Sequence, residues 1–255
     1  MQLKVRSTNF TCGTFFSIKN ASYQYSDAEK DEYALKNVSY DFEKGKIYGL
    51  LGKNGAGKTT TMRMLLNMAA KTGGKIILFG NIPNNNTYRK IGSIIETPGF
   101  YENLTAEENL KIISKIRGNY SKEKIREILS TVSLDDNNKK YGDFSLGMKQ
   151  RLGIAAAIMH KPELLILDEP INGLDPIGIK KIRHLLKRLS RANSTTILIS
   201  SHILSEIENI ADVIGFMDEG VLIEEITREE LYERLDKHVE FEVSNTDLAV
   251  KIFKE

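Results

Sequence analysis

The sequence predicts an α/β fold, in which short buried strands alternate with helices. The main observation is a series of short apolar runs, several of them hydrophobic on both faces, as in strands of a sheet that helices cover. The runs occupy residues 46–51, 75–80, 91–95, 164–167, 195–200 and 213–217. Helical patterns lie between these runs, and a strand followed by a helix, repeated along one chain, favours a mainly parallel sheet with flanking helices.

Three of the helices have recognisable start signals. Thr105 with Glu108 fits a capping box in front of an apolar pattern, and Thr227 with Glu230 fits a second one. The Asp-Pro pair at 175–176 is typical of an N-cap followed by a first-turn proline. Each signal predicts that a helix begins at the next residue.

One region breaks the alternation of strands and helices. Residues 101–160 contain helical patterns only, which predicts a helical subdomain inserted between two strands. The Asn-rich segments at 81–90 and 134–140 are polar and are expected to be loops. In the tail, residues 238–243 resemble a strand and residues 246–254 a helix, so the tail is either a small appendage or the start of a longer one.

Charge, hydropathy and cysteine content point to no special class of protein. The net charge of +2 gives no reason to expect nucleic acid as a partner. No run approaches the roughly 18 to 20 apolar residues of a membrane span, and residues 1–13 lack the apolar core of a signal peptide. The single cysteine, Cys12, cannot form an internal disulfide, which fits a reducing compartment, and we assign it no chemistry. We therefore expect a folded protein of the cytoplasm.

The segment GKNGAGKT at 52–59 matches a phosphate-binding loop, with an apolar strand before it and a helical pattern after it. Its glycines, Gly52, Gly55 and Gly57, allow backbone N–H groups to close around phosphate oxygens. Lys58 is expected to reach the terminal phosphates, and the Thr59 hydroxyl is expected to ligate magnesium.

The segment LLILDEP at 164–170 supplies a second element of the same site. An apolar strand ends in Asp168, which is expected to hold the magnesium through water, and Glu169 beside it is expected to polarise an attacking water. Two carboxylates directly after a buried strand are costly unless a cation or nucleophile is handled there. The alternative is a strand that runs into an acidic turn, and the phosphate loop favours the catalytic interpretation.

With these motifs in place, the sequence resembles the ATP-binding cassette (ABC) ATPases from residue 16 to about 225. The segment FSLGMKQRLGIA at 144–155 is similar to the family's signature, although Leu146 and Met148 replace its usual glycine and glutamine. Ser145 and Gly147, the phosphate contacts of that motif, are retained. Because this motif closes over the ATP of a second cassette in the family, the resemblance implies a head-to-tail homodimer with two composite sites.

The resemblance also assigns roles to three single residues. Asp175 belongs to the dimer-contact loop, His202 is the switch histidine near the terminal phosphate, and Tyr25 stacks on adenine. The alternatives are a strand aromatic for Tyr25, with Tyr23 on the same face, and a helix-start residue for His202. The remaining histidines are left out of the site: His160, interpreted as a structural helix end, His184 and His238.

Glu96 is the main departure from the family pattern. Most members have glutamine at the end of the strand after the phosphate-loop helix, and the only glutamines here are Gln2, Gln24 and Gln150. Glutamate exchanges an amide for a charge and is the stronger oxygen ligand for magnesium. We expect Glu96 to be the metal-side and coupling residue; the alternative is a solvent-facing loop carboxylate.

The resemblance implies a P-loop NTPase core with a mainly parallel sheet, an antiparallel β edge and the helical subdomain at 101–160. It places the ATPase domain at 16–225, an N-terminal extension at 1–15 and a C-terminal appendage at 226–255. The implied cofactors are ATP and Mg²⁺. The expected nucleotide contacts are Tyr25, Gly52, Asn54, Gly55, Gly57, Lys58, Thr59, Thr60, Glu96, Ser145, Gly147 and Asp175. The expected catalytic residues are Glu169, His202 and Lys58, and the expected metal ligands are Thr59, Glu96 and Asp168.

Glutamate at position 96, together with the run IIETPGFYENLTAEENL, is similar to the ATPase subunits of bacterial exporters that protect cells from bacitracin and lantibiotics. This branch implies a separate membrane permease, a membrane-active peptide as cargo and a place at the cytoplasmic face of the membrane. The alternatives are a subunit of another drug, ion or lipid transporter, an importer subunit, a non-hydrolytic regulatory cassette, and a cassette ATPase acting on ribosomes or DNA.

Overall fold

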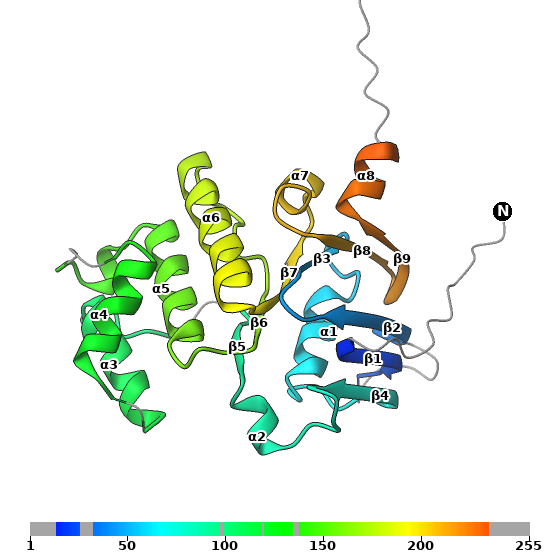
Figure 1. Ribbon diagram of the computed structural model, residues 1–255, viewed down its shortest axis with the longest axis horizontal. Coiled ribbons are helices and arrows are strands. Elements are labelled where there is room, and N and C mark those ends of the chain that lie inside the picture. Colours follow the sequence, from blue (N-terminus) through cyan, green and yellow to red (C-terminus); the bar gives the residue numbers. More distant parts are fainter. Residues whose placement is uncertain (1–13, 26–32, 97–98, 119, 135–137, 235–255) are drawn as a thin grey trace, which may run out of the picture.

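The computed structural model describes residues 14–25, 33–96, 99–118, 120–134 and 138–234. It confirms the predicted α/β fold. The larger of two sheets has the strand order β5-β6-β7-β3-β8-β9, in which all neighbours are parallel except β8 and β9 (Figure 1). Its strands are β3 (Ile47–Leu51), β5 (Ile91–Ile94), β6 (Leu164–Leu167), β7 (Thr196–Ser201), β8 (Val213–Asp218) and β9 (Val221–Thr227).

The second sheet is antiparallel and has the order β2-β1-β4. Its strands are β1 (Thr14–Tyr23), β2 (Leu35–Glu43) and β4 (Gly73–Leu78). The apolar run at 75–80 therefore forms a strand, but one that pairs antiparallel with β1 outside the parallel sheet. Of the residues of β4, only Ile76 and Leu78 are buried, and their alternation suits a strand with one face on the core.

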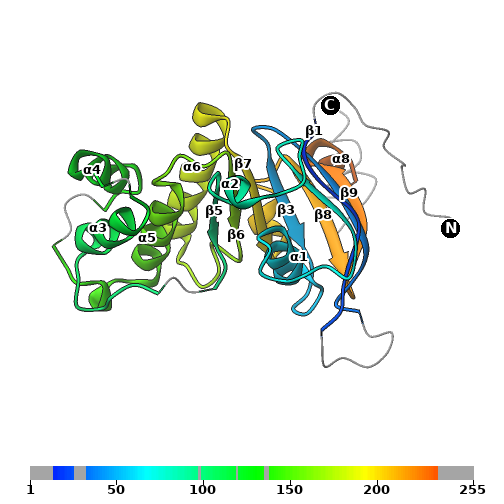
Figure 2. The same cartoon turned by 90° about the horizontal axis from the view of Figure 1, so that it is seen from below.

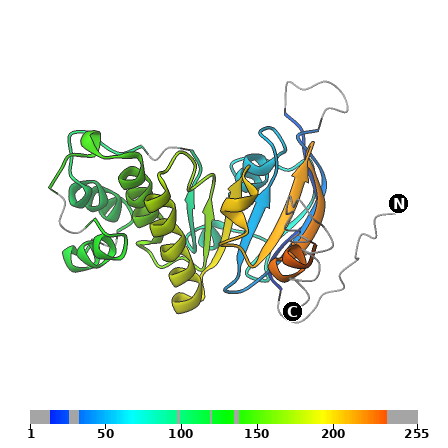
Figure 3. The ribbon, with the colours of Figure 1, turned by 90° about the horizontal axis from the view of Figure 1, so that it is seen from above.

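Between β5 and β6, the described residues form helices and no strand of either sheet, as the pattern at 101–160 predicts. They are α3 (Ala106–Ile116), α4 (Lys122–Thr131) and α5 (Leu146–Ile158), with a 3₁₀ turn at Tyr141–Asp143. Figures 2 and 3 show these helices, drawn in green, at one end of the molecule and strands β1, β8 and β9 at the other. The other helices are α1 (Lys58–Leu65), α2 (Asn85–Tyr88), α6 (Pro176–Asn193), α7 (Leu204–Ile207) and α8 (Arg228–Arg234).

The three predicted helix starts are confirmed. Thr105 Oγ1 accepts from Glu108 N–H, and the Glu108 carboxylate accepts from Thr105 N–H at 2.8 Å. Thr227 and Glu230 exchange the same pair of bonds in front of α8. Asp175 Oδ1 accepts from the N–H of residue 178 at 3.0 Å and caps α6. Each cap satisfies N–H groups that the first turn leaves without helical partners.

One loop prediction is wrong, because the segment at 81–90 contains the short helix α2. Asn84 caps this helix by accepting from the N–H groups of Asn86 and Thr87, and the Thr87 hydroxyl closes a capping box. Asparagine favours both turns and helix caps, so polar composition alone does not separate the two.

Two apolar clusters lie on opposite faces of the larger sheet. In β6, Leu165 and Leu167 belong to the cluster that includes the helices of the inserted region, while Leu164 and Ile166 belong to the cluster shared with α1 and the antiparallel sheet. All four are completely buried. This arrangement explains why the strand is apolar on both faces, since side chains alternate across the sheet.

His160 lies just past the end of α5, in agreement with its interpretation as a structural helix end. Its Nε2 lies 3.1 Å from the carbonyl oxygen of Ile91 in β5, and its Nδ1 lies 2.6 Å from the Arg117 guanidinium at the end of α3. Because a guanidinium only donates, Nδ1 accepts and Nε2–H donates, which defines the neutral tautomer. Burial and the Arg117 charge lower the pKa of His160.

The His160 contacts predict a pH dependence of stability. Because the pKa of His160 is lower in the folded state than its ordinary value of 6.5, the unfolded chain binds the proton more readily. The contribution of neutral His160 is therefore complete above pH 6.5 and is lost as the pH falls below it. The measurement is denaturant unfolding of the wild type and of His160→Gln at pH 7.5 and at pH 5.5, one pH above and one below the ordinary histidine pKa of about 6.5. The difference in unfolding free energy between the two proteins should be smaller at pH 5.5. A constant difference would contradict the neutral tautomer.

Several sequence predictions lie outside the described residues. These are Cys12, the strand and helix predicted in the tail, and His238. In the described part of the chain, no helix combines the length and the apolar character needed to span a bilayer.

Candidate functional site

The phosphate-loop sequence joins β3 to α1. Gly55 and Gly57 have φ values of 84° and 100°, in the left-handed region that favours glycine. A Cβ atom on Gly57 would also lie 2.7 Å from the Leu35 side chain. Gly57 is the N-cap of α1. In α1 as the structure describes it, no side chain caps the first turn and the first turn contains no acidic residue. The loop therefore presents the start of a helix to an anion.

Lys58 is the first residue of α1, and its ammonium group turns back into the loop. Lys58 Nζ donates to the Gly52 carbonyl at 2.7 Å and to the Lys53 carbonyl at 3.1 Å. It also lies 3.6 Å from Glu169 Oε1. The residue is only 5% exposed. A buried ammonium held by two carbonyls is fixed in position, and a phosphate placed in the loop would meet it.

Asp168 follows β6 and lies opposite the loop. Asp168 Oδ2 accepts from Thr59 Oγ1 at 2.6 Å, and Asp168 Oδ1 accepts from Ser200 Oγ. The hydroxyl of Thr59 and the carboxylate of Asp168 thus meet at one point, although they lie 109 residues apart in the sequence. Both are oxygen ligands of the kind that magnesium prefers.

Glu169 connects the loop with the residue after β7. It has a φ of 46°, so a non-glycine residue adopts the left-handed conformation two residues after the strand ends. Its Oε2 lies 3.0 Å from His202 Nδ1, and its Oε1 faces Lys58. The structure therefore brings Lys58, Asp168, Glu169 and His202 together from three loops that follow adjacent strands.

These residues fit a magnesium nucleotide. Protein sites for magnesium usually supply one or two carboxylates and leave the remaining positions to water and substrate phosphates. Thr59 and Asp168 form such a partial set, and the described residues contain no cluster of three or more acidic, histidine or cysteine side chains that would form a closed metal cage. The glycine cradle and the start of α1 supply the complementary phosphate site.

Ser200 is a site residue that the sequence reasoning missed. Its hydroxyl donates to Asp168 Oδ1 and accepts from the Glu169 N–H at 2.8 Å. Ser200 is completely buried on β7, which pairs in parallel with β6. The only available signal was the Ser-Ser-His run, and the pairing of β6 with β7 is needed to show that its first serine lies beside the acidic pair.

Replacing Ser200 should remove the hydroxyl group that links Asp168 to Glu169. In Ser200→Ala, Asp168 loses a donor and the Glu169 N–H loses an acceptor, which should cost about 1–3 kcal/mol of unfolding free energy. We also expect ATP turnover to fall by about tenfold, because the carboxylates lose a fixed position. Ser205→Ala, an exposed serine nearby, is the matched control. Equal turnover in both variants would refute a positioning role for Ser200.

The segment carrying His202 is anchored by a buried pair. Ser201 Oγ donates to Glu206 Oε2 and accepts from the Ile203 N–H at 3.0 Å. Glu206 is only 8% exposed. These bonds hold the turn on both sides of His202, so the imidazole is presented to Glu169 from a fixed backbone.

Glu96 follows β5 and contacts a cation that the sequence reasoning did not identify. Its carboxylate forms an ion pair with Arg63 of α1, and its side chain is 67% exposed. Its φ of 68° is left-handed, like that of Glu169. Arg63 therefore supplies a positive charge to the carboxylate that stands where most of the family has glutamine.

Tyr25 lies two residues beyond the end of β1, so it is not a residue of that strand. The residue is 47% exposed, and its ring makes an edge contact with Tyr23 at a centroid distance of 5.0 Å. Its hydroxyl lies 3.4 Å from Thr60 Oγ1, next to the phosphate-loop helix start. An exposed ring at this position is available for stacking.

Ser145, Gly147 and Asp175 lie at two other helix starts. Ser145 caps α5 by accepting from the Met148 N–H at 3.3 Å, and Asp175 caps α6. A Cβ atom on Gly147 would lie 3.7 Å from Leu174, so the start of α5 packs beside the residues before α6. Figure 1 shows α5 next to α3 and α4 and apart from α1. These residues thus form a second group, separate from the phosphate loop.

Comparisons with known proteins match this arrangement. The family model for ABC transporters covers residues 35–172. The bacitracin transport ATP-binding protein BcrA of Enterococcus faecalis is 55% identical over 240 residues, which is 92% of this chain and 77% of that protein. The lantibiotic transport ATP-binding protein SrtF of Streptococcus pyogenes is 49% identical over 190 residues, covering 74% of this chain and 82% of that protein.

Solved structures agree with the fold. The ATP-binding cassette MJ0796, in a dimeric post-hydrolysis state bound to ADP and phosphate, superposes with a TM-score of 0.73 at 26% identity, covering 84% of this chain and 98% of that one. The family match spans more than half of the chain, and its first part contains the phosphate loop with the cradle described above. The chain therefore belongs to the ABC transporter family as an ATP-binding subunit.

Proposed function

We propose that this chain hydrolyses ATP to drive a separate membrane permease that removes bacitracin-like or lantibiotic peptides from the membrane. The observation that carries the ATPase part is the assembly of Lys58, Asp168, Glu169 and His202 around one phosphate loop. The relatives named as bacitracin and lantibiotic transport proteins support the cargo class.

In this proposal each residue has a distinct role. Thr59 and Asp168 would hold Mg²⁺, which would neutralise charge on the phosphate oxygens. Lys58 contacts the terminal phosphates. Glu169 accepts a proton from the attacking water. His202 lies 3.0 Å from the Glu169 carboxylate, so the imidazole orients this carboxylate. The imidazole would also face the terminal phosphate. Positioning and charge neutralisation carry most phosphoryl-transfer catalysis, so the fixed geometry of these groups is the essential feature.

The second group of residues completes the site from another copy of the chain. Ser145 and Gly147 lie at the start of α5, and a Ser-capped helix start suits an anion. Asp175 caps the neighbouring helix, where it would contact the partner. We propose a homodimer in which these residues close over the ATP held by the phosphate loop of the partner. Asn54, Thr60 and Tyr25 complete the nucleotide contacts.

Glu96 is proposed to contact magnesium when nucleotide is present. Its carboxylate would then leave the ion pair with Arg63 and face the metal instead. Glu96→Gln should then raise the Mg²⁺ concentration needed for half-maximal ATPase activity several-fold, because a carboxylate is the stronger ligand. Arg63→Gln removes the ion pair but keeps the carboxylate, so it should not raise that concentration. Unchanged turnover, magnesium dependence and transport in Glu96→Gln would contradict the proposal.

The proposed location is the cytoplasmic face of the membrane, where the chain would be held by its permease. A survival assay tests the cargo. Host cells carrying the native permease and either the intact chain or Glu169→Gln are exposed to a panel of bacitracin-like and lantibiotic peptides. Protection against one peptide class that is lost in the variant would identify the cargo. Equal survival across the panel would reject peptide export while leaving the ATPase assignment to be judged by turnover.

A further inference from the structure

A pocket lies at the opposite end of the β3 strand from the phosphate loop. It has a volume of about 370 Å³ and lies between the C-terminal half of α6 and the strand ends at Ile47, Val213 and Thr227. Ile47 begins β3, whereas the phosphate loop follows its last residue. Five residues of extended strand span about 16 Å, so the two sites are separate.

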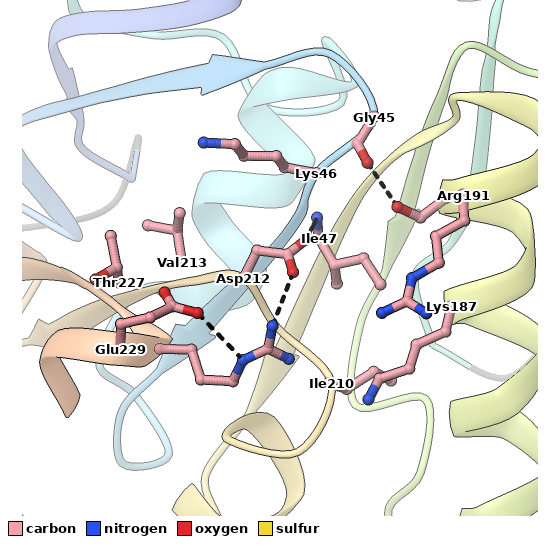
Figure 4. A pocket seen from close by; sticks show the side chains of 12 residues that line it. Gly45, Lys46, Ile47, Lys187, Arg191, Ile210, Asp212, Val213, Thr227 and Glu229 are labelled. Carbon is pink, nitrogen blue, oxygen red and sulfur yellow. Dashed lines mark hydrogen bonds and ion pairs between the residues drawn. The ribbon is translucent and has the colours of Figure 1, made fainter. Parts of the chain in front are cut away.

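Basic side chains dominate this pocket, which we call the basic pocket. Its charged lining residues are Lys46, Lys187, Arg191, Arg228, Asp212 and Glu229. Figure 4 shows Lys187 and Arg191 extending from α6 on one side, with Asp212 and Glu229 on the other. Ile47, Ile210 and Val213 provide apolar walls and are almost completely buried.

The two carboxylates of the pocket, those of Asp212 and Glu229, contact groups other than Lys187 and Arg191. Asp212 Oδ2 accepts from the Ile47 N–H at 2.9 Å, and Asp212 Oδ1 accepts from the Arg228 guanidinium at 3.5 Å. Glu229 lies 4.0 Å from the same guanidinium. Lys46 pairs with Glu43, outside the pocket, at 2.9 Å. Among the described residues, Lys187 and Arg191 thus have no carboxylate within ion-pair distance.

The surroundings of Lys187 are net positive. Arg183, Lys187 and Arg191 are spaced four residues apart on α6 and therefore share one helix face. Burial lowers the pKa of Lys187, and the charges of Arg228, Arg191 and Arg183 lower it further, while Asp212 is the smallest of these influences and acts in the opposite direction. The pocket therefore holds like charges whose repulsion a bound anion would relieve.

We propose that the basic pocket binds the phosphate group of a small soluble molecule, with Lys187 and Arg191 as its principal ligands. The guanidinium offers two parallel donors to phosphate oxygens, and the ammonium adds a point charge. The volume lies near the lower limit for small-molecule pockets and suits a compact phosphate or diphosphate with a small organic part.

Pyrophosphate binding tests the proposal by calorimetry on the full chain, at low ionic strength and in a buffer without phosphate. The background is Lys58→Met, which removes the main phosphate contact of the nucleotide site. We expect saturable binding that becomes at least tenfold weaker in Lys58→Met/Lys187→Gln/Arg191→Gln. The matched control is Lys58→Met/Lys180→Gln/Lys181→Gln, which removes the same charge from exposed positions of α6 and should bind as the background does.

The outcomes separate the alternatives. Absence of saturable binding in the background would overturn the proposal, and so would equal affinity in the two triple variants, because binding would then not depend specifically on Lys187 and Arg191. Vesicles containing phosphatidylglycerol test a lipid source of the phosphate. Binding of such vesicles through Lys187 and Arg191 without competition by pyrophosphate would overturn the assignment to a soluble ligand. Unfolding measurements on each variant verify that it is folded.

Discussion

Glu169→Gln is expected to lower ATP turnover by about 10² to 10⁴, the range for loss of a general base. Binding should survive, because the substitution leaves the phosphate loop, Thr59 and Asp168 in place. It also removes the negative charge that lies 3.6 Å from Lys58, so the ammonium group becomes freer to meet a phosphate. The variant should therefore accumulate ATP in a closed dimer that size-exclusion chromatography detects.

Glu127→Gln, an exposed residue of α4, is the matched control and should turn over ATP at the wild-type rate. Rapid turnover by Glu169→Gln would remove Glu169 from the role of base. Loss of ATP binding in the same variant would also contradict the proposal, because it would assign Glu169 to nucleotide affinity rather than to the chemical step.

Lys58→Met is expected to weaken ATP binding by about 10- to 100-fold, the cost of a charged hydrogen bond to phosphate. Turnover at saturating ATP should fall by a further 10² or more, since the ammonium is aimed at charge that develops in the transition state. Nucleotide titration followed by steady-state kinetics separates the two effects. Lys71→Met, an exposed lysine beyond α1, should change neither.

Loss of folding is the main competing explanation for Lys58→Met. Lys58 is 5% exposed and satisfies the Gly52 and Lys53 carbonyls, so its removal leaves two acceptors in the loop without this donor. Thermal unfolding should nevertheless show a folded variant, because the glycine cradle and the core around α1 are unchanged. A folded Lys58→Met with wild-type affinity would refute the assigned role.

Local signals predicted most of the fold. The run at 164–167 forms β6, and the Thr105 cap begins α3 where its sequence indicates, because capping and buried strands depend on neighbouring residues. The choice of a strand's partner does not depend on neighbouring residues in the sequence. The run at 75–80 predicts a strand, yet only the antiparallel register of Phe16 with Leu78 shows which sheet it joins. Such pairings join segments that are distant in the sequence, and the local sequence pattern of a strand does not indicate its partner.

The same distinction applies to the candidate site. The phosphate loop is contiguous, so its residues could be predicted from spacing alone. Ser200 and Arg63 could not, because each acts through a residue from a distant segment: Asp168, which follows β6, and Glu96, which follows β5. Glu96 was singled out as a departure from a family pattern, but its contact with an arginine depends on how α1 packs against that strand end.

The parallel register described for β3, β6 and β7 has a consequence for the newly synthesised chain. Leu167 pairs with Ile199, and Leu50 pairs with Ser200, so the groups that would handle ATP meet only when β3, near the start of the chain, is aligned with the distant strands β6 and β7. A slip of one residue would turn Ser200 to the other face. Non-local pairing of this kind forms slowly, because the chain must first lose the entropy of closing a long loop. A chain still emerging from the ribosome would therefore consume no ATP before its sheet is complete.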